Sequence, residues 1–201
     1  MKTAILGGTF DPIHIGHLVI AEQAAHRLQL EQVLFIPAGN PRLKTNPSVI
    51  PAYHRLEMTR LAIAGNPRFR LSDMEVKRPG PTYTVDTVRQ LKAETGEGRE
   101  LFFIMGWDSL ENIRSWKEPA SLVKMCRLVT VPRVGYARPS LKTLEENIPG
   151  ISEAVEFLDA PLIGVTSSDI RDGVTRGLSI RYLVPEAVER YILEQRLYRS
   201  Q

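Results

Sequence analysis

The sequence predicts an α/β fold: a Rossmann-like, doubly wound parallel sheet with a small C-terminal helical extension. Three observations predict it. β-rich runs alternate with helical patterns, the first three segments read strand, helix and strand, and two helical patterns close the chain. A strand–helix–strand unit implies parallel strands joined by a right-handed crossover. Continued alternation favours helices on both faces of the sheet. We expect residues 1–201 to form a single domain.

The first strand–helix–strand unit lies at the start of the chain. The β-rich run Lys2–Leu6 ends in Gly7-Gly8, apolar residues recur at helical spacing over Gly16–Leu30, and Val33–Pro37 is the second β-rich run. The same reasoning predicts the later elements in this order: a helix at Ala52–Ala64, a strand at Phe69–Val76, a helix at Thr84–Glu94 stopped by Gly96, strands at Leu101–Met105, Arg127–Val131 and Val155–Leu158, and helices at Ser168–Thr175 and Pro185–Gln195.

Two connections between these elements stand out. The segment Pro37–Pro51 contains four prolines and Lys44, and Pro132–Pro139 begins beside Arg133. Long loops in compact domains are usually functional or disordered. The sequence leaves both interpretations open for these two segments.

Composition excludes several classes of protein. Hydrophobic residues make up 43% and charged residues 24%, as in ordinary globular domains. The net charge is +3 with no Lys/Arg run longer than two, which suits anionic small molecules better than nucleic acid. The single cysteine, Cys126, lies in an apolar stretch typical of an inert buried thiol, and no zinc site is indicated. Neither a signal peptide nor a membrane span is recognisable, so we expect a cytoplasmic protein.

The first motif follows the first predicted strand. Residues 7–18 read Gly-Gly-Thr-Phe-Asp-Pro-Ile-His-Ile-Gly-His-Leu. In a doubly wound sheet, ligands bind at the carboxyl ends of the strands. Gly7 and Gly8 allow close approach of the backbone to a ligand, and His14 and His17 share one side of a helix start. That helix N-terminus also offers free N–H groups to an anion, so the segment predicts a phosphate site.

The second motif lies far along the chain. Residues 166–171 read Thr-Ser-Ser-Asp-Ile-Arg, and Thr166 with Asp169 matches a capping box at a helix start. A capped helix with a surface Arg171 is an equally ordinary interpretation of this string taken alone.

Together the two strings resemble the signatures of the nucleotidyltransferase superfamily. The first matches its Gly-Thr-Phe-Asp-Pro turn followed by His-x-Gly-His, and the second its Ser-Ser-Thr-x-Ile-Arg. The resemblance implies direct attack on the α-phosphorus of a nucleoside triphosphate with release of pyrophosphate. By that resemblance His14 and His17 neutralise phosphate charge, Ser167 binds ATP phosphates, and Arg171 neutralises the β and γ groups.

Further strings are similar to those of bacterial nicotinate mononucleotide adenylyltransferases. Residues 81–87 read Pro-Thr-Tyr-Thr-Val-Asp-Thr and residues 106–108 read Gly-Trp-Asp, while Trp116 stands at the place of a family Trp near the pyridine ring. Residues 183–188, 191–192 and 197–198 match the family's C-terminal ending. The resemblance covers nearly the whole chain. It implies transfer of the adenylyl group of ATP to nicotinate mononucleotide, giving deamido-NAD and pyrophosphate in NAD biosynthesis.

The resemblance implies three overlapping groups of site residues and one ion. The catalytic group comprises His14, His17, Lys44 and Arg171. The ATP-binding group comprises Gly7, Gly8, Thr9, Phe10, His14, His17, Gly106, Asp108, Ser167, Ile170 and Arg171. The mononucleotide-binding group comprises Lys44, Thr82, Tyr83, Thr84, Asp108, Trp116 and Arg133. Magnesium is expected to arrive with ATP, and no residue is assigned to bind it.

The chain departs from the family pattern at a few positions. Leu43 replaces a common loop histidine, Thr82 replaces a serine, and Trp107 replaces a small residue. Alternatives stay open: a phosphopantetheine adenylyltransferase, a cytidylyltransferase, a module that binds ATP without turnover, or a nucleic-acid binder. The sequence is compatible with a homo-oligomer as well as a monomer, and it indicates neither a nucleic-acid nor a membrane partner.

Overall fold

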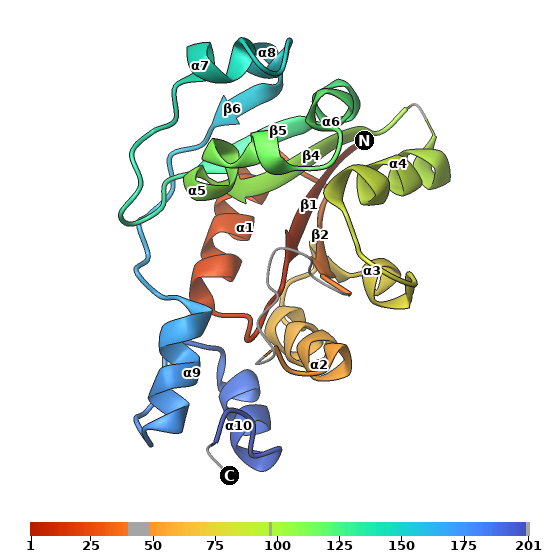
Figure 1. Cartoon of the computed structure of the whole chain (residues 1–201). Helices are drawn as coiled ribbons and strands as arrows, with labels where there is room; N and C mark the ends of the chain where they lie inside the picture. Colours follow the sequence, from red (N-terminus) through yellow and green to blue (C-terminus); the bar gives the residue numbers. More distant parts are fainter. Residues whose placement is uncertain (40–48, 97, 200–201) are drawn as a thin grey trace.

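A computed structural model describes residues 1–39, 49–96 and 98–199 of the chain. Its centre is a sheet of six parallel strands in the order β3-β2-β1-β4-β5-β6 (Figure 1). The strands are β1 (Lys2–Gly8), β2 (Gln32–Pro37), β3 (Phe69–Leu71), β4 (Glu100–Gly106), β5 (Arg127–Val131) and β6 (Val155–Phe157).

This strand order confirms the doubly wound sheet. From the central β1 the chain moves outward through β2 to β3, then returns to β4 and moves outward the other way. The order reverses between β1 and β4, and such a switch point leaves a crevice at the carboxyl ends of the two strands. Gly8 and Gly106 end these two strands, so the fold places both glycine-containing strings at that crevice.

Side-chain alternation along the strands divides the core into two layers. In β4, Phe102 and Ile104 belong to one buried cluster, whereas Phe103 and Met105 belong to the other. Neighbouring side chains in a strand point to opposite faces, so both faces of the sheet are buried. The helices that cover the first face include α1 (Ile15–Arg27) and α2 (Ala52–Ile63), and those that cover the second include α4 (Thr84–Thr95), α6 (Pro119–Met125), α7 (Leu141–Glu145) and α8 (Ile151–Ala154).

Two helices form the predicted C-terminal extension, α9 (Ser167–Thr175) and α10 (Glu186–Glu194). They lie beyond the sheet, near α1 and α2 (Figure 1). Val188 and Ile192 of α10 are buried in the same cluster as Met58 of α2. His54 Nδ1 and the Tyr191 hydroxyl lie 2.9 Å apart and add a hydrogen bond between these helices.

The predicted strand Phe69–Val76 is wrong beyond Leu71. The Ser72 amide still donates to the Phe35 carbonyl at 2.9 Å, but the chain then turns into the short helix α3 (Met74–Lys77). Within α3 the Glu75 side chain is buried and accepts a hydrogen bond from Thr87 Oγ1 at 2.6 Å. The contact between the buried Glu75 carboxylate and Thr87 therefore favours a helix at Met74–Lys77. The local sequence pattern does not reveal this tertiary contact.

Helices of four to seven residues were not predicted. These are α3, α5 (Trp107–Glu111), α6, α7 and α8, together with a 3-10 turn at Ile113–Ser115. None is long enough to repeat an apolar pattern over several turns, which is the signal that sequence reasoning uses. No helix among the described residues has the length and apolar character needed to cross a membrane.

Candidate active site

The turn after β1 forms one wall of the site. A Cβ placed on Gly8 would lie 2.9 Å from Phe10 Cε1, so only glycine allows the Phe10 ring to fold back beneath the turn. Phe10 has a φ of +50°, an uncommon backbone conformation for a residue with a side chain. Its ring is buried and meets the His17 ring edge-on at 5.0 Å between centroids. The Phe10 side chain thus packs against the turn and supports it.

His14 and His17 meet at the start of α1. His14 is the residue before the helix, and its amide donates to His17 Nδ1 at 3.2 Å. The two rings lie 3.7 Å apart between centroids, as the three-residue spacing predicts. His14 is only 4% exposed, and its Nδ1 has no hydrogen-bond partner among the described residues.

The environment of His14 keeps its ring neutral. Burial is the main cause that lowers its pKa from 6.5 to about 4, and the positive charge of Arg133 adds to the effect. At pH 7 the free protein therefore presents His14 as a neutral imidazole. A neutral imidazole next to phosphate donates a hydrogen bond from one ring nitrogen, and a bound anion would favour its protonation.

The second motif joins the first at the N-terminus of α9. The Thr166 side chain accepts from the Asp169 amide at 3.1 Å, which confirms the predicted helix cap. Ser167 Oγ donates to the Pro12 carbonyl at 2.9 Å, and Arg171 Nη1 donates to the Asp11 carbonyl at 2.7 Å. Two strings about 155 positions apart thus form one surface.

Asp11 connects the turn to the C-terminal extension. The residue is buried, with 3% of its surface exposed. Its Oδ1 accepts a hydrogen bond from the Tyr198 hydroxyl at 2.7 Å, and its Oδ2 lies 3.9 Å from Arg171 Nη1. Burial and the adjacent Asp11 charge raise the pKa of Tyr198, so its hydroxyl stays protonated and donates. Sequence reasoning assigned no role to Asp11 or Tyr198.

The end of β4 supplies the opposite wall. A Cβ on Gly106 would lie 2.3 Å from Asp108 Oδ1, so a side chain at position 106 would displace that carboxylate. Arg133 follows β5, and its Nε lies 3.7 Å from Asp108 Oδ2. Both side chains are partly exposed, which leaves the carboxylate available to hydroxyl groups of a ligand and the guanidinium available to a phosphate. The structure therefore brings these predicted residues together with His14.

Some of the predicted acceptor residues lie at or near the N-terminus of α4. Tyr83 is the residue before this helix, and its carbonyl accepts from the Asp86 and Thr87 amides, both at 3.1 Å. Trp116 is partly buried, and its ring meets that of Phe103 edge-on at 5.8 Å. Lys117 Nζ lies 4.8 Å from the centre of the Tyr83 ring. Neighbouring segments therefore supply the Trp116 ring and the N-terminus of α4, and a helix N-terminus favours anions.

Some predicted residues lie elsewhere or outside the described chain. Lys44 falls within residues 40–48, outside the described residues, and so does Leu43. Ile170 is fully buried in the core beneath α9, so its side chain packs. Cys126 is buried and its pKa is raised to about 12, mainly by burial, as expected of an inert thiol. Trp107 is partly buried, and its Nε1 has no hydrogen-bond partner among the described residues. Nothing in the structure explains why a tryptophan stands at this position.

Sequence reasoning missed Arg55 entirely. This residue of α2 is 1% exposed and donates to the carbonyls of Thr9, Gly39 and Ile50. A buried arginine is rare unless its donors are satisfied. No local sequence signal distinguishes it from the exposed Arg60 one turn later, because the difference arises from the segments that fold against α2.

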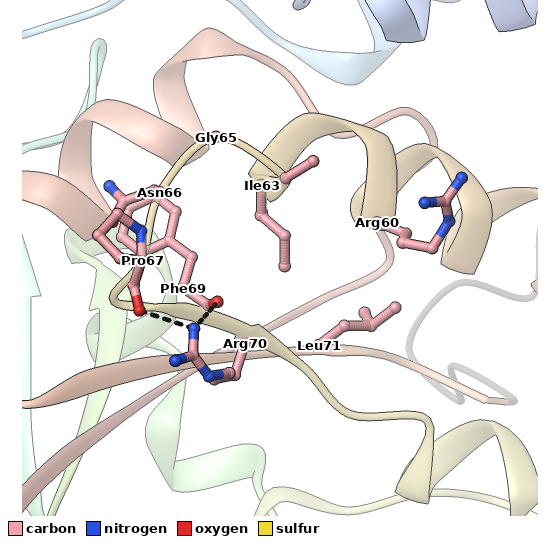
Figure 2. A pocket seen from close by; sticks show the side chains of 9 residues that line it. Arg60, Ile63, Gly65, Asn66, Pro67, Phe69, Arg70 and Leu71 are labelled. Atoms are coloured by element: carbon pink, nitrogen blue, oxygen red, sulfur yellow. Dashed lines mark hydrogen bonds between the residues drawn. The ribbon is translucent and has the colours of Figure 1, made fainter.

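Two hollows in the surface lie away from these residues. One, of about 540 Å³, lies between the end of α2 and the edge strand β3 and is lined by residues that include Arg60, Asn66 and Arg70 (Figure 2). There Arg70 Nη1 donates to the carbonyls of Pro67 and Phe69. A second, of about 460 Å³, lies beside Cys126 at the amino ends of β4 and β5. Neither is lined by a predicted site residue.

The described residues contain no cluster of side chains that could by itself coordinate a metal ion. Over 1–39, 49–96 and 98–199, no group of three or more His, Cys, Asp or Glu side chains is arranged to hold an ion. Magnesium usually keeps several waters and binds through substrate phosphates with one or two carboxylates.

Comparison with known proteins adds independent information. A family model described as cytidylyltransferase-like matches residues 5–173. A relative from Dehalococcoides mccartyi is 46% identical and aligns over 100% of this chain and 98% of its own length. One from Geobacter sp. is also 46% identical, with 98% of each covered, and one from Thermomicrobium roseum is 44% identical, with 99% and 92% covered. All three are named "Probable nicotinate-nucleotide adenylyltransferase".

Solved structures support the fold. The Plasmodium falciparum nicotinic acid mononucleotide adenylyltransferase complexed with NaAD superposes with a TM-score of 0.81 at 20% identity, covering 98% of this chain and 97% of its own. The family model spans most of the sheet and both motifs, and the relatives align along essentially the full length. The chain belongs to the cytidylyltransferase-like family and, within it, to the nicotinate-nucleotide adenylyltransferases.

Proposed function

We propose that this protein transfers the adenylyl group of ATP to nicotinate mononucleotide, releasing pyrophosphate and forming deamido-NAD. A phosphate oxygen of the mononucleotide attacks the α-phosphorus of ATP. One P–O bond forms there while the bond to the β-phosphate oxygen breaks, and pyrophosphate leaves with the electron pair. The attacking phosphate is already ionised at neutral pH, so the reaction needs positioning and charge neutralisation rather than a strong base.

One observation carries this proposal. The turn after β1 and the N-terminus of α9, far apart in sequence, are held together by the hydrogen bonds of Ser167 and Arg171 to the carbonyls of Pro12 and Asp11. Both segments bring helix N-termini and donors to the same edge of the sheet. This arrangement suits a triphosphate, which spreads its charge over several phosphates and needs donors from more than one direction.

The two sides of the crevice suit different parts of the reaction. On the ATP side, Gly7 to Phe10 would offer backbone groups, and His14 and His17 would contact the phosphates at the bond that breaks. Arg171 would meet the leaving pyrophosphate. On the acceptor side, Arg133 would bind the mononucleotide phosphate, Asp108 would bind ribose hydroxyls, and Trp116 with the start of α4 would hold the pyridine ring.

Magnesium would accompany ATP. Its charge would offset that of the phosphates in the transfer. Lys44 stays a proposed catalytic and mononucleotide-binding residue, from a segment outside the described residues.

The direct test is a product assay. The purified chain is incubated with ATP, magnesium and one acceptor at a time: nicotinate mononucleotide, nicotinamide mononucleotide or phosphopantetheine; CTP replaces ATP in a parallel series. Pyrophosphate release is followed and the product mass is measured. The proposal expects rapid formation of deamido-NAD from ATP and nicotinate mononucleotide. Turnover only with phosphopantetheine or only with CTP would assign the chain another reaction, and ATP binding without pyrophosphate release would make it a sensor.

A further inference from the structure

Arg55 occupies the junction between three backbone segments that surround the site. Its Nη1 donates to the Thr9 carbonyl at 2.8 Å, its Nη2 to the Gly39 carbonyl at 3.1 Å, and its Nε to the Ile50 carbonyl at 3.2 Å. Each of the three guanidinium nitrogens thus holds a carbonyl from a different segment. A lysine has a single nitrogen and cannot reproduce this planar, three-sided pattern.

Arg55 lies in the core, where a charged side chain is costly unless its hydrogen-bond donors are satisfied. Its side chain is 1% exposed, and burial lowers its pKa although the nearby Asp11 and Tyr198 raise it. A guanidinium keeps its charge under these conditions, so an arginine is tolerated here only with its donors satisfied. An apolar residue of similar length would pack on α2 at lower electrostatic cost. The arginine therefore has a use beyond filling the core.

One of the three carbonyls belongs to the phosphate-binding turn. Thr9 immediately precedes Phe10, whose φ of +50° is unfavourable for a phenylalanine. Such a conformation persists only where the surroundings fix it. Arg55 holds the carbonyl on one side of this residue, and Arg171 holds the Asp11 carbonyl on the other at 2.7 Å. Two arginines from different helices thus bracket the turn.

A second carbonyl leads toward the acceptor side. A Cβ on Gly39 would lie 2.1 Å from the Glu75 carbonyl oxygen, so Gly39 is pressed against α3. The buried Glu75 side chain in turn accepts from Thr87 Oγ1 of α4 at 2.6 Å. A continuous set of contacts therefore runs from the turn through Arg55 and Gly39 to the helix whose N-terminus would receive the mononucleotide.

We propose that Arg55 is a positioning residue that fixes the phosphate-binding turn after β1 relative to the acceptor-binding end of α4. It does not touch either substrate. It acts by holding the Thr9 and Gly39 carbonyls at a fixed separation, so that the two substrates meet at the distance that in-line attack requires. This inference rests on the proposed adenylyl transfer.

The experiment compares Arg55→Met and Arg55→Lys with a matched control. Met58→Ala is the control, because Met58 is fully buried on the same helix and its apolar side chain cannot donate a hydrogen bond to a backbone carbonyl. For each variant, thermal unfolding and circular dichroism give the folded fraction, and steady-state kinetics give kcat and both KM values. A loss of folded protein lowers kcat and leaves both KM values unchanged, whereas a displaced turn changes KM for ATP.

For Arg55→Met we expect kcat/KM to fall by about 100-fold, the scale of a displacement of about 1 Å at a reacting centre, with KM for ATP raised. Arg55→Lys should recover part of this loss. Met58→Ala, with a comparable fall in Tm, should keep both KM values. Wild-type kinetics in folded Arg55→Met, or an equal rise of KM in Met58→Ala, would overturn the proposal.

Two further outcomes are also decisive. If Arg55→Met does not fold, folded Arg55→Lys decides: unchanged KM for ATP and unchanged kcat refute the positioning role, and a raised KM supports it. The wild-type protein reports separately on the underlying reaction. If it releases no pyrophosphate from ATP and nicotinate mononucleotide, the proposed function fails; if it does and the Arg55 variants match it, only the positioning role fails.

Discussion

The fold changes the protonation state expected for His14, a residue of the first sequence motif. The motif places two histidines at a helix start, and both were expected to neutralise phosphate charge. Burial beside the positive Arg133 lowers the pKa of His14 to about 4. Its ring is therefore neutral at pH 7 before any ligand arrives. Charge neutralisation by this residue would begin only when a bound phosphate raises its pKa again.

The His14 pKa predicts how stability depends on pH. The unfolded chain protonates this histidine near pH 6.5, whereas the folded chain does so near pH 4. Acidification between these values therefore stabilises the unfolded state, and the stability from a neutral His14 is lost as pH falls. Between pH 7 and pH 5 the loss is about 2 kcal/mol. Urea unfolding at both pH values should show it in the wild type and not in His14→Asn. An equal loss in both proteins would mean that His14 titrates normally.

His17 gives the simplest test of catalysis. It lies beside His14 at the start of α1, and its Nδ1 accepts the His14 amide hydrogen bond at 3.2 Å. We expect His17→Ala to fold and to lose at least ~10²-fold in kcat, the scale of losing one transition-state contact. Circular dichroism checks the fold. Unchanged turnover in the folded variant would remove His17 from the catalytic group.

Trp116 tests the acceptor pocket. If its ring stacks on the pyridine, Trp116→Ala should weaken the mononucleotide by about 1–3 kcal/mol, by analogy with bases on aromatic side chains. The KM for ATP should change much less. Trp116→Phe, which retains a ring beside Phe103, is the matched control and should lose less. An effect confined to the ATP constant would place Trp116 outside the acceptor pocket.

At the scale of elements, the N-terminus of α4 combines two features that bear on specificity. The amides of its first two residues, Thr84 and Val85, have no carbonyl partner within the helix, as at any helix start, and Lys117 lies nearby. Lys117 Nζ is already 2.9 Å from Asp86 Oδ2, and Asp86 also pairs with Arg89 at 2.9 Å. The cation is thus engaged by a carboxylate of α4. The backbone of this helix start is therefore the better candidate to bind a substrate carboxylate.

We predict a preference for nicotinate over nicotinamide mononucleotide of at least ~10-fold in kcat/KM. The amide group would place its NH2 against backbone donors, and leaving donors unsatisfied costs about 1–3 kcal/mol. Kinetics with both mononucleotides measure the preference in the wild type and in Lys117→Met. The preference should survive in Lys117→Met. Its disappearance there would assign the selection to the lysine, and equal use of both substrates by the wild type would show that neither group selects.

The sequence predicted elements well where their pattern repeats. The strands β1, β2, β4 and β5 and the helices α1, α2, α4, α9 and α10 all lie within a few residues of the predicted bounds. The extension of β3 was wrong because the buried Glu75 draws the chain toward α4. The start of α6 was hidden as well, since Glu118 adopts a φ of +48° that only the surrounding fold can impose.

At the scale of the molecule, the C-terminal extension and the first motif form one unit. Besides the bonds from α9, the Ile15 amide donates to the Leu183 carbonyl at 3.0 Å, and the Tyr198 hydroxyl donates to Asp11 Oδ1 at 2.7 Å. The extension therefore supplies part of the support beneath the turn after β1. Motif reasoning identified Ser167 and Arg171. It assigned no role to Asp11, Arg55 or Tyr198, because their roles depend on which distant segments become neighbours.

Tyr198→Phe tests that support. The substitution leaves the buried Asp11 carboxylate without its hydroxyl partner, which costs about 1–3 kcal/mol of the free energy of unfolding. Chemical denaturation measures the loss. Tyr182→Phe is the control, since Tyr182 is 81% exposed, and it should change stability little. A Tyr198→Phe variant as stable as the wild type would show that the Asp11 carboxylate does not need this bond.

The two halves of the site are far apart along the chain, and this separation affects the order in which parts of the protein fold. The bonds that join Ser167 to Pro12, Arg171 to Asp11 and Tyr198 to Asp11 close loops of 155, 160 and 187 residues. Contacts between distant segments repay their loop-closure entropy only after the intervening chain is ordered. During refolding, helices and the central strands would therefore form before the phosphate site does. Recovery of catalytic activity would lag behind recovery of secondary structure, and the site would be among the first parts lost when the protein begins to open.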